Sequence, residues 1–410
     1  MAENVTDARR GNPAGGAALP PGSDEASSGV YRIIHGRALG AASFIGRTWD
    51  SVFLAVRRPF GMVGTAMILP YRKFGTPDRL RVAGRVVEDR GVVAAPHTDS
   101  TPANLWLTFK RYATYEVPEA KVRIRFAAED HTIVTDRKGF FEMEIKPAAP
   151  IELPPPETWF PVKITLVSAQ AEQSPPLTAE AYVLIPPATA RFGIISDIDD
   201  TIVQTGVTNI LKHWRTVVAN SAEARVAFRG LAPFYRALHG GAGGADGNPV
   251  FYVSSSPWNL YDLFERFLVL HDIPLGPIVL RPVGIGAGHW PGGSHKENKL
   301  MQIDRILSTY PHLPFILVGD SGQHDAEIYA ETAERHPGRV LGIYIRDVTE
   351  AERDLKVEAV LKPARGKGIR VAYGPDLIEA AEDSVAAGWI AASALPEIRA
   401  AVADPDRPGA

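Results

Sequence analysis

From residue 192 onward the chain contains five short, uninterrupted apolar runs that are separated by helical segments. Each run is too short for a helix and is bounded by Gly, Pro or acidic residues. Such runs are typical of parallel strands that are buried on both faces, because helices cover both sides of the sheet. The pattern therefore predicts a doubly wound α/β domain with strands at 192–195, 250–253, 278–280, 315–318 and 340–345.

Ahead of this region, apolar and charged side chains alternate with a period of two. Val122, Ile124 and Phe126, for example, are separated by Arg123 and Arg125. This period indicates strands that are buried on one face only. Several short strands with turn signals between them are typical of an antiparallel sandwich. We therefore expect a β-sandwich-like domain at 66–187, followed by the doubly wound, Rossmann-like domain at 188–375.

The two ends of the chain differ from these domains in composition. Residues 1–29 are rich in Gly, Ala, Pro and Ser, without the apolar core of a secretory signal, which predicts a disordered tail and a cytoplasmic protein. Residues 376–410 are Ala-rich and predict a helical tail with a disordered end.

Between the first tail and the β domain lies a basic segment, 30–65, with apolar residues at helical spacing. Residues 29–73 hold seven Arg and Lys residues and one Asp, a net charge of +6 in a chain whose formal net charge is −3. Arg72 and Lys73 are the last two of these basic residues. One interpretation is a helix that binds an anionic membrane surface peripherally. The alternative is a helix whose apolar stripe packs on the neighbouring domain.

Composition excludes several classes of function. A net charge of −3 provides no chain-wide basic surface, so we expect no nucleic-acid partner. The chain has no cysteine, so any metal must be held by oxygen or imidazole ligands. No run of 18 apolar residues is present, so we expect no transmembrane segment.

The first apolar run leads directly into the pentad DIDDT, residues 197–201. In an extended segment Asp197 and Asp199 point to the same side, so two carboxylates converge above the sheet. They stay ionised together only near a cation; otherwise one keeps its proton. Mg²⁺ at Asp197 and a protonated Asp199 would together serve phosphoryl transfer, with Thr201 completing the catalytic candidates. The alternative is a polar loop of helix-capping aspartates.

Polar residues also follow two other apolar runs. Ser254 and Ser255 come after the second run, where a hydroxyl and free backbone N–H groups suit a phosphate oxygen. Asp320 comes after the fourth run, and Asp325 follows five residues later. Carboxylates at a strand end can ligate Mg²⁺ directly or support it through water. As alternatives, the serines and acids are ordinary helix caps.

Two lysines between these motifs, Lys296 and Lys299, open a helical segment and lie on one face of it. A lysine that points at the site would offset the charge shared by Asp197 and the phosphoryl oxygens. The alternative is that both lysines are solvated, as most lysines are.

In this order, the four motifs resemble those of the haloacid dehalogenase superfamily of Mg²⁺-dependent phosphohydrolases. The resemblance implies that Asp197 attacks phosphorus and that Asp199 acts first as acid and then as base. It also implies that Ser254 and a lysine bind phosphate, while Mg²⁺ is held by carboxylates from the set Asp197, Asp199, Asp320 and Asp325.

A narrower resemblance is carried by FGIISDIDDTIVQTGVT (192–208), FYVSSSPWNLYDLF (251–264) and PFILVGDSGQHDAEIYAE (314–331). These stretches resemble the catalytic domain of the yeast actin-patch-associated phosphatidate phosphatase family. The stretch ILPYRKFGTPDRLRVAGRVVEDRG (68–91) resembles the region that precedes catalysis in that family. Family members usually have one lysine about twenty residues before the Gly-Asp pair. Lys299 lies 21 residues before Asp320 (320 − 299), so it is preferred to Lys296.

The resemblance implies hydrolysis of phosphatidate to diacylglycerol and phosphate at a membrane surface. The 205–230 segment is too short for a large cap, which agrees with a lipid substrate. Trp258, Phe264 and Trp290 are candidates for a rim that contacts acyl chains. Two alternatives stay open: a phosphatase for a soluble phosphomonoester or phosphoprotein, and a non-catalytic membrane-associated scaffold.

Overall fold

The computed structural model describes nine stretches of the chain, all within the compact unit Gly64–Ala410. They are residues 66–88, 116–126, 129–154, 156–168, 177–198, 230–281, 295–322, 324–348 and 351–403. The predicted tail at 1–29, the basic segment at 30–65 and the end of the chain from 404 lie outside them. So do Asp199, Thr201 and Trp290.

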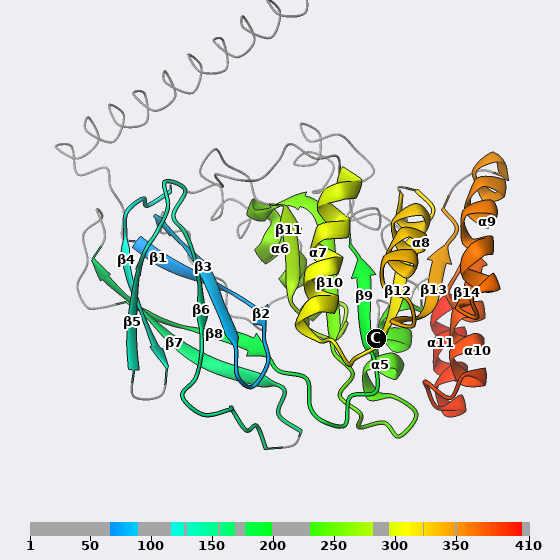
Figure 1. Cartoon of the computed structure of the whole chain (residues 1–410), viewed down its shortest axis with the longest axis horizontal. Helices are drawn as coiled ribbons and strands as arrows, with labels where there is room; N and C mark the ends of the chain where they lie inside the picture. Colours follow the sequence, from blue (N-terminus) through cyan, green and yellow to red (C-terminus); the bar gives the residue numbers. More distant parts are fainter. Residues whose placement is uncertain are drawn as a thin grey trace, which may run out of the picture. The chain divides into compact units, whose positions relative to one another are not determined.

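A six-stranded parallel sheet forms the C-terminal part of this unit (Figure 1). All five predicted runs are strands of this sheet, so the predicted parallel sheet is confirmed. In spatial order the strands are β11 (Ile278–Arg281), β10 (Val250–Pro257), β9 (Gly193–Asp197), β12 (Phe315–Asp320), β13 (Val340–Arg346) and β14 (Arg370–Gly374).

The sequence analysis missed β14, and the reason is its position at the edge of the sheet. Only Ala372 of its five residues is fully buried, so the strand lacks the continuous apolar run that marks an internal parallel strand. Its polar first residue, Arg370, further obscures the pattern.

Successive residues of the central strands enter two different hydrophobic clusters, one on each face of the sheet. Ile194 and Ile316 belong to the cluster with α5 (Leu231–Gly240), α6 (Tyr261–Leu270), α10 (Ile378–Ala386) and α11 (Leu395–Ala403). Ile195 and Leu317 belong to the cluster with α7 (His295–Thr309), α8 (Asp325–Arg335) and α9 (Ala351–Gly366). Helices therefore cover both faces of the sheet, as the apolar runs predict.

The chain order defines where a site should lie. From β9 the chain passes to β10 and β11 on one side, and then to β12, β13 and β14 on the other. The strand order thus reverses between β9 and β12. In such sheets ligands bind outside the carboxyl ends of the strands at the reversal point, which here is the edge where β9 and β12 end.

The region before the parallel sheet contains two smaller sheets. One consists of β1 (Ala66–Tyr71), β3 (Leu80–Glu88) and β6 (Phe140–Ile145), all antiparallel. The other is ordered β2 (Lys73–Phe74), β8 (Thr178–Leu184), β7 (Trp159–Ser168), β4 (Lys121–Phe126) and β5 (Glu129–Val134), antiparallel except for the β2–β8 pair. On β4, Val122 and Ile124 are fully buried while Lys121 and Arg125 are exposed. This arrangement is compatible with the predicted sandwich.

Two parts of the membrane hypothesis need correction. Arg72 and Lys73, which were counted with the basic segment, are held inside the folded unit: Arg72 pairs with Glu265, and Lys73 is only 6% exposed. Phe264, a predicted acyl-contacting residue, is fully buried in the core. Among the described helices, none combines the length and apolar character that crossing a bilayer requires.

Candidate active site

Two aspartates end the two strands at the reversal point of the sheet. Asp197 is the last residue of β9, and Asp320 is the last residue of β12, the parallel neighbour of β9. Both side chains are buried. Asp197 also lies in register with Val253 of β10, and Ser254 is the next residue of that strand, which continues to Pro257. The strand ends therefore place these predicted residues along one edge of the sheet.

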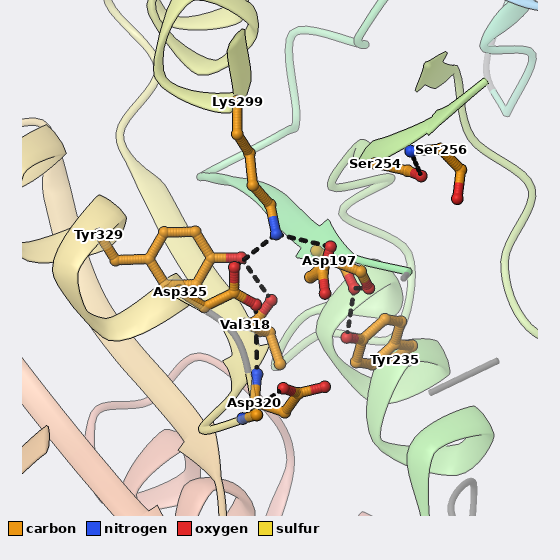
Figure 2. Close-up of polar contacts among 11 residues, drawn as sticks. Asp197, Tyr235, Ser254, Ser256, Lys299, Val318, Asp320, Asp325 and Tyr329 are labelled. Carbon is orange, nitrogen blue, oxygen red and sulfur yellow. Dashed lines mark hydrogen bonds and ion pairs between the residues drawn. The ribbon is translucent and has the colours of Figure 1, made fainter. Parts of the chain in front are cut away.

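Lys299 joins two of the carboxylates in a buried cluster (Figure 2). Its Nζ donates to Asp197 Oδ1 at 2.6 Å and also donates to Asp325 Oδ1. The Lys299 and Asp197 side chains are 2% exposed, and that of Asp325 is 0% exposed. The lysine comes from the start of α7 and Asp325 is the first residue of α8, so three separate elements converge here.

The second oxygen of Asp325 is held by the end of β12. The backbone N–H of Asp320 donates to Asp325 Oδ2 at 3.3 Å. Gly319 allows this approach, because a Cβ at that position would meet Asp325 Oδ2 and would lie 2.9 Å from Asp325 Cβ. Both oxygens of Asp325 thus have protein donors, a role that the sequence analysis did not predict. Its support of a metal through water stays a prediction.

The cluster contains more negative than positive charge. Burial raises the pKa of the Asp325 carboxyl well above its usual value; Asp197 and Asp320 raise it further, whereas Lys299 lowers it. The Lys299 ammonium group therefore binds two of these buried carboxylates, and a third, Asp320, is close enough to raise the pKa of Asp325 further. An additional cation would relieve this repulsion.

The residues present fit such a cation. Asp197 Oδ2 is buried and has no hydrogen-bond partner among the described residues. One oxygen of Asp320, Oδ1, accepts from the backbone of Gly322 at 2.9 Å. In the described stretches no group of three or more His, Cys, Asp or Glu side chains is placed to hold a metal, and Asp199 lies outside them. Carboxylate oxygens are the ligands that Mg²⁺ prefers, so Asp197 and Asp320 would hold it.

Of the two candidate lysines, only Lys299 reaches the carboxylates. Lys296 is 39% exposed and its Nζ pairs with Glu331 Oε2 at 2.7 Å. The alternative that the lysines are solvated is therefore right for Lys296 and wrong for Lys299.

The candidate serines lie at the end of the adjacent strand. Ser254 is 1% exposed, and its Oγ accepts from the backbone N–H of Ser256 at 2.9 Å. Ser255 is half-buried. Figure 2 shows Ser254 on the far side of Asp197 from Asp325. Their binding of phosphate stays a prediction.

Two tyrosines that sequence reasoning missed support the strand ends. Tyr235 of α5 shares a hydrogen bond of 2.7 Å with Ser196 Oγ, which in turn donates to the backbone oxygen of Asp197 at 2.7 Å. Burial raises the pKa of Tyr235 above its usual value, so its hydroxyl remains a donor. On α8, Tyr329 donates to the backbone oxygen of Val318 at 2.9 Å. The one available sequence signal was Ser196, a polar residue that closes an apolar run.

Comparison with known proteins agrees with this site. The chain is 37% identical over 164 residues to phosphatidate phosphatase APP1 of Saccharomyces cerevisiae, an alignment of 40% of this chain and 27% of that protein. It is 29% identical over 245 residues to an uncharacterized protein of Schizosaccharomyces pombe, covering 58% of this chain and 37% of that one. The alignments thus span less than two fifths of the length of either curated relative.

A structural neighbour adds no argument. A carbohydrate acetylesterase from Xanthomonas citri aligns over 71% of this chain and 72% of its own, with 10% identity and a TM-score of only 0.24.

The family comparison covers the site itself. Residues 192–347 match the model of the family described as "Phosphatidate phosphatase APP1, catalytic domain". This stretch includes Asp197, Ser254, Lys299, Asp320 and Asp325. The resemblance inferred from the sequence is therefore confirmed over the segment that builds the carboxylate and lysine cluster.

Proposed function

We propose that the protein is a phosphatase of the haloacid dehalogenase type that hydrolyses phosphatidate to diacylglycerol and phosphate. The observation that carries the proposal is how the two carboxylate oxygens of Asp197 are hydrogen-bonded. Lys299 holds one of its oxygens, while the other is buried at the strand end and has no partner within the described part of the chain. The match of this segment to a phosphatidate phosphatase family supports the lipid substrate.

In this proposal Asp197 is the nucleophile. Its carboxylate attacks phosphorus, a P–O bond forms to a carboxylate oxygen, and the bond between phosphorus and the alkoxide oxygen of the lipid breaks. Lys299 fixes the Asp197 side chain through Oδ1 and offsets charge on the phosphoryl oxygens. Because Asp325 holds Lys299 from the other side, the ammonium group is already in place before substrate binds.

Asp199 would protonate the departing diacylglycerol oxygen and then take a proton from the water that hydrolyses the aspartyl-phosphate. Ser254 and Ser255 would bind the phosphate oxygens. When bound, Mg²⁺ would be held by Asp197 and Asp320 and would stabilise negative charge on the phosphoryl group. Since the substrate is a lipid, the protein would act at a membrane surface.

The direct test is an assay of phosphate release from phosphatidate in detergent micelles, with Mg²⁺ and with a chelator. We expect release that depends on Mg²⁺ and that exceeds release from a panel of soluble phosphomonoesters and phosphopeptides. Faster turnover of a soluble substrate would replace the lipid assignment but keep the phosphatase. No release from any substrate would leave a non-catalytic scaffold.

A further inference from the structure

Residues from the β region surround Trp258, the side chain that follows the candidate phosphate-binding segment 254–257. The Trp258 ring lies 5.0 Å from the Tyr71 ring and 6.3 Å from the Phe140 ring, between centroids. On the catalytic side it stacks on Tyr261, with centroids 5.9 Å apart and planes 15° apart. The ammonium group of Lys73 lies 4.6 Å from the centre of the same ring. Trp258 thus contacts both regions.

Arg72 connects the same two regions by its backbone and its side chain. Its backbone N–H donates to the Tyr261 hydroxyl at 2.7 Å, and its Nε donates to Glu265 Oε1 at 2.7 Å. Tyr261 and Glu265 lie one turn apart on α6, directly after Trp258. The guanidinium group itself lies 5.1 Å from the ring centres of Trp159 on β7 and Tyr182 on β8. Arg72 therefore ties the start of α6 to the five-stranded sheet.

Strand pairing becomes irregular along the serine part of β10. The ladder between β10 and β9 ends at the pair of Val253 and Asp197. On the other side of β10, pairing with β11 shifts register between Val253 and Pro257. Pairing with β11 resumes at Pro257, opposite Arg281, and the contacts of Trp258 and Tyr261 hold the chain directly after it, so these contacts help to fix one end of the serine segment.

The contacts between the two regions include a buried charge, the Lys73 ammonium group. Lys73 is 6% exposed, and burial lowers the pKa of its ammonium group, with Glu142 opposing that effect. Placing a buried ammonium against an indole ring costs desolvation energy that an apolar residue would avoid. The contacts of Lys73 and Arg72 depend on direction, unlike those of an apolar residue. Lys73 orients the Trp258 ring, and Arg72 orients α6 relative to the rings of Trp159 and Tyr182.

We propose that Arg72 is a positioning residue for the reaction, which holds the serine segment 254–257 through Tyr261, Glu265 and Trp258. The inference rests on the proposed function, because it takes Ser254 as a phosphate ligand. It gives the β region a role that the family match at 192–347 does not cover: the β region fixes the phosphate-binding side of the site.

The test compares two variants that each remove an ion pair between the β region and the catalytic region. Arg72→Met breaks the pair with Glu265. The matched control is Arg305→Met, which breaks the 2.7 Å pair between Arg305 of α7 and Glu142 of β6 without touching α6. For both full-length proteins we would measure kcat and KM for phosphatidate, inhibition by inorganic phosphate, and the melting midpoint.

For Arg72→Met we expect KM and the phosphate inhibition constant to rise together by about tenfold, because a small displacement of a binding group has effects of that order. Arg305→Met should leave both constants unchanged. Arg72→Lys, which keeps the charge but loses the planar group between two rings, should fall between the two. If Arg72→Met does not fold, Glu265→Gln removes the same ion pair from the α6 side. It should also raise KM and the phosphate inhibition constant.

Two results would overturn the inference. If Arg72→Met and Glu265→Gln lower the melting midpoint but bind phosphate as the wild type does, the contacts only stabilise the fold. The same conclusion holds if Arg305→Met raises the phosphate constant equally. A wild-type protein that releases no phosphate would instead refute the proposed function, and the inference with it.

Discussion

Helices α7 and α8 carry two lysine–carboxylate contacts that differ in burial rather than in chemistry. On the inner side, Lys299 and Asp325 are almost completely buried and contact Asp197 and the end of β12. On the outer side, Lys296 and Glu331 are 39% and 30% exposed, and Arg335 adds a second pair to the same glutamate. The two lysines are separated by less than one turn of α7.

The difference teaches how to recognise a functional charge. An exposed ion pair contributes about 0–1 kcal/mol to stability, so its loss has little effect. Buried charges cost several kcal/mol each in lost hydration, and a well-packed apolar group would often be more stable. Stability therefore does not account for the inner cluster, whereas the proposed chemistry at Asp197 would account for it. Four substitutions test this comparison, in order of expected effect.

The largest effect should come from Asp197→Asn. This change removes the proposed nucleophile but keeps the shape and a hydrogen-bond acceptor for Lys299, so we expect kcat to fall by at least about 10³-fold with the fold retained. Phosphate release and circular dichroism measure the two quantities. Activity close to that of the wild type would show that Asp197 is not the nucleophile.

Next in size is Lys299→Met, with Lys296→Met as its matched control. Loss of the buried ammonium should lower kcat by about 10²- to 10³-fold, whereas loss of the exposed one should change it less than about twofold. Melting midpoints are needed because breaking a buried pair also destabilises by about 3–5 kcal/mol. If Lys299→Met does not fold, Lys299→Gln is the milder replacement. Equal effects at both positions would contradict the comparison.

A smaller effect is expected from Gly319→Ala. The added methyl group would lie against the Asp325 carboxylate, and neither the buried helix start nor the strand end can move freely. We expect a loss of about 1–3 kcal/mol in the free energy of unfolding, together with reduced kcat, because Lys299 loses its second anchor. Denaturant titration checks the first. A neutral result would mean that Asp325 need not contact Gly319.

The smallest effect concerns Asp262, a half-buried carboxylate on α6. Its burial lies between that of Asp325 and that of the exposed Arg335. Burial, reinforced by Glu265, raises its pKa from 3.8 to about 7. Because the pKa is higher in the folded state, protonation favours folding, and this contribution is lost as the pH rises from about 4 through about 7.

The Asp262→Asn variant has an amide in place of the carboxyl group, and the amide does not ionise in this pH range. The variant should therefore gain stability relative to the wild type between pH 5 and pH 8, on the order of 1–2 kcal/mol after allowance for partial exposure. Melting midpoints at the two pH values measure this difference. A difference that does not change with pH would contradict the raised pKa.

The sequence predicts those parts of the fold and site whose signals are local. Internal parallel strands are buried on both faces and read as apolar runs, so Asp197 and Asp320 could be placed at strand ends from the sequence. The run at 250–253 predicted a strand end before Ser254 as well, but β10 continues through the serines to Pro257. The choice of Lys299 came from its spacing to Asp320. Edge strand β14 lacked such a run and was missed.

Contacts between distant segments could not be predicted, because no local pattern encodes them. Arg72 and Glu265 are separated by 193 residues, and Ser196 and Tyr235 by 39. Arg72 and Lys73 were grouped with a basic segment on charge alone, although their neighbours in space are rings and acids. Asp199 and Thr201 lie outside the described residues, so their roles stay predictions.

Tyr71 and Phe74, only three positions apart, enter the hydrophobic clusters on opposite faces of the parallel sheet. A fragment limited to the family match would therefore lose apolar side chains from both faces of the sheet, and it would also lose β14 and the helices α9, α10 and α11. The segment matched by the family model is thus shorter than the segment whose side chains cover both faces of the sheet. Truncations for biophysical work should accordingly begin before residue 66.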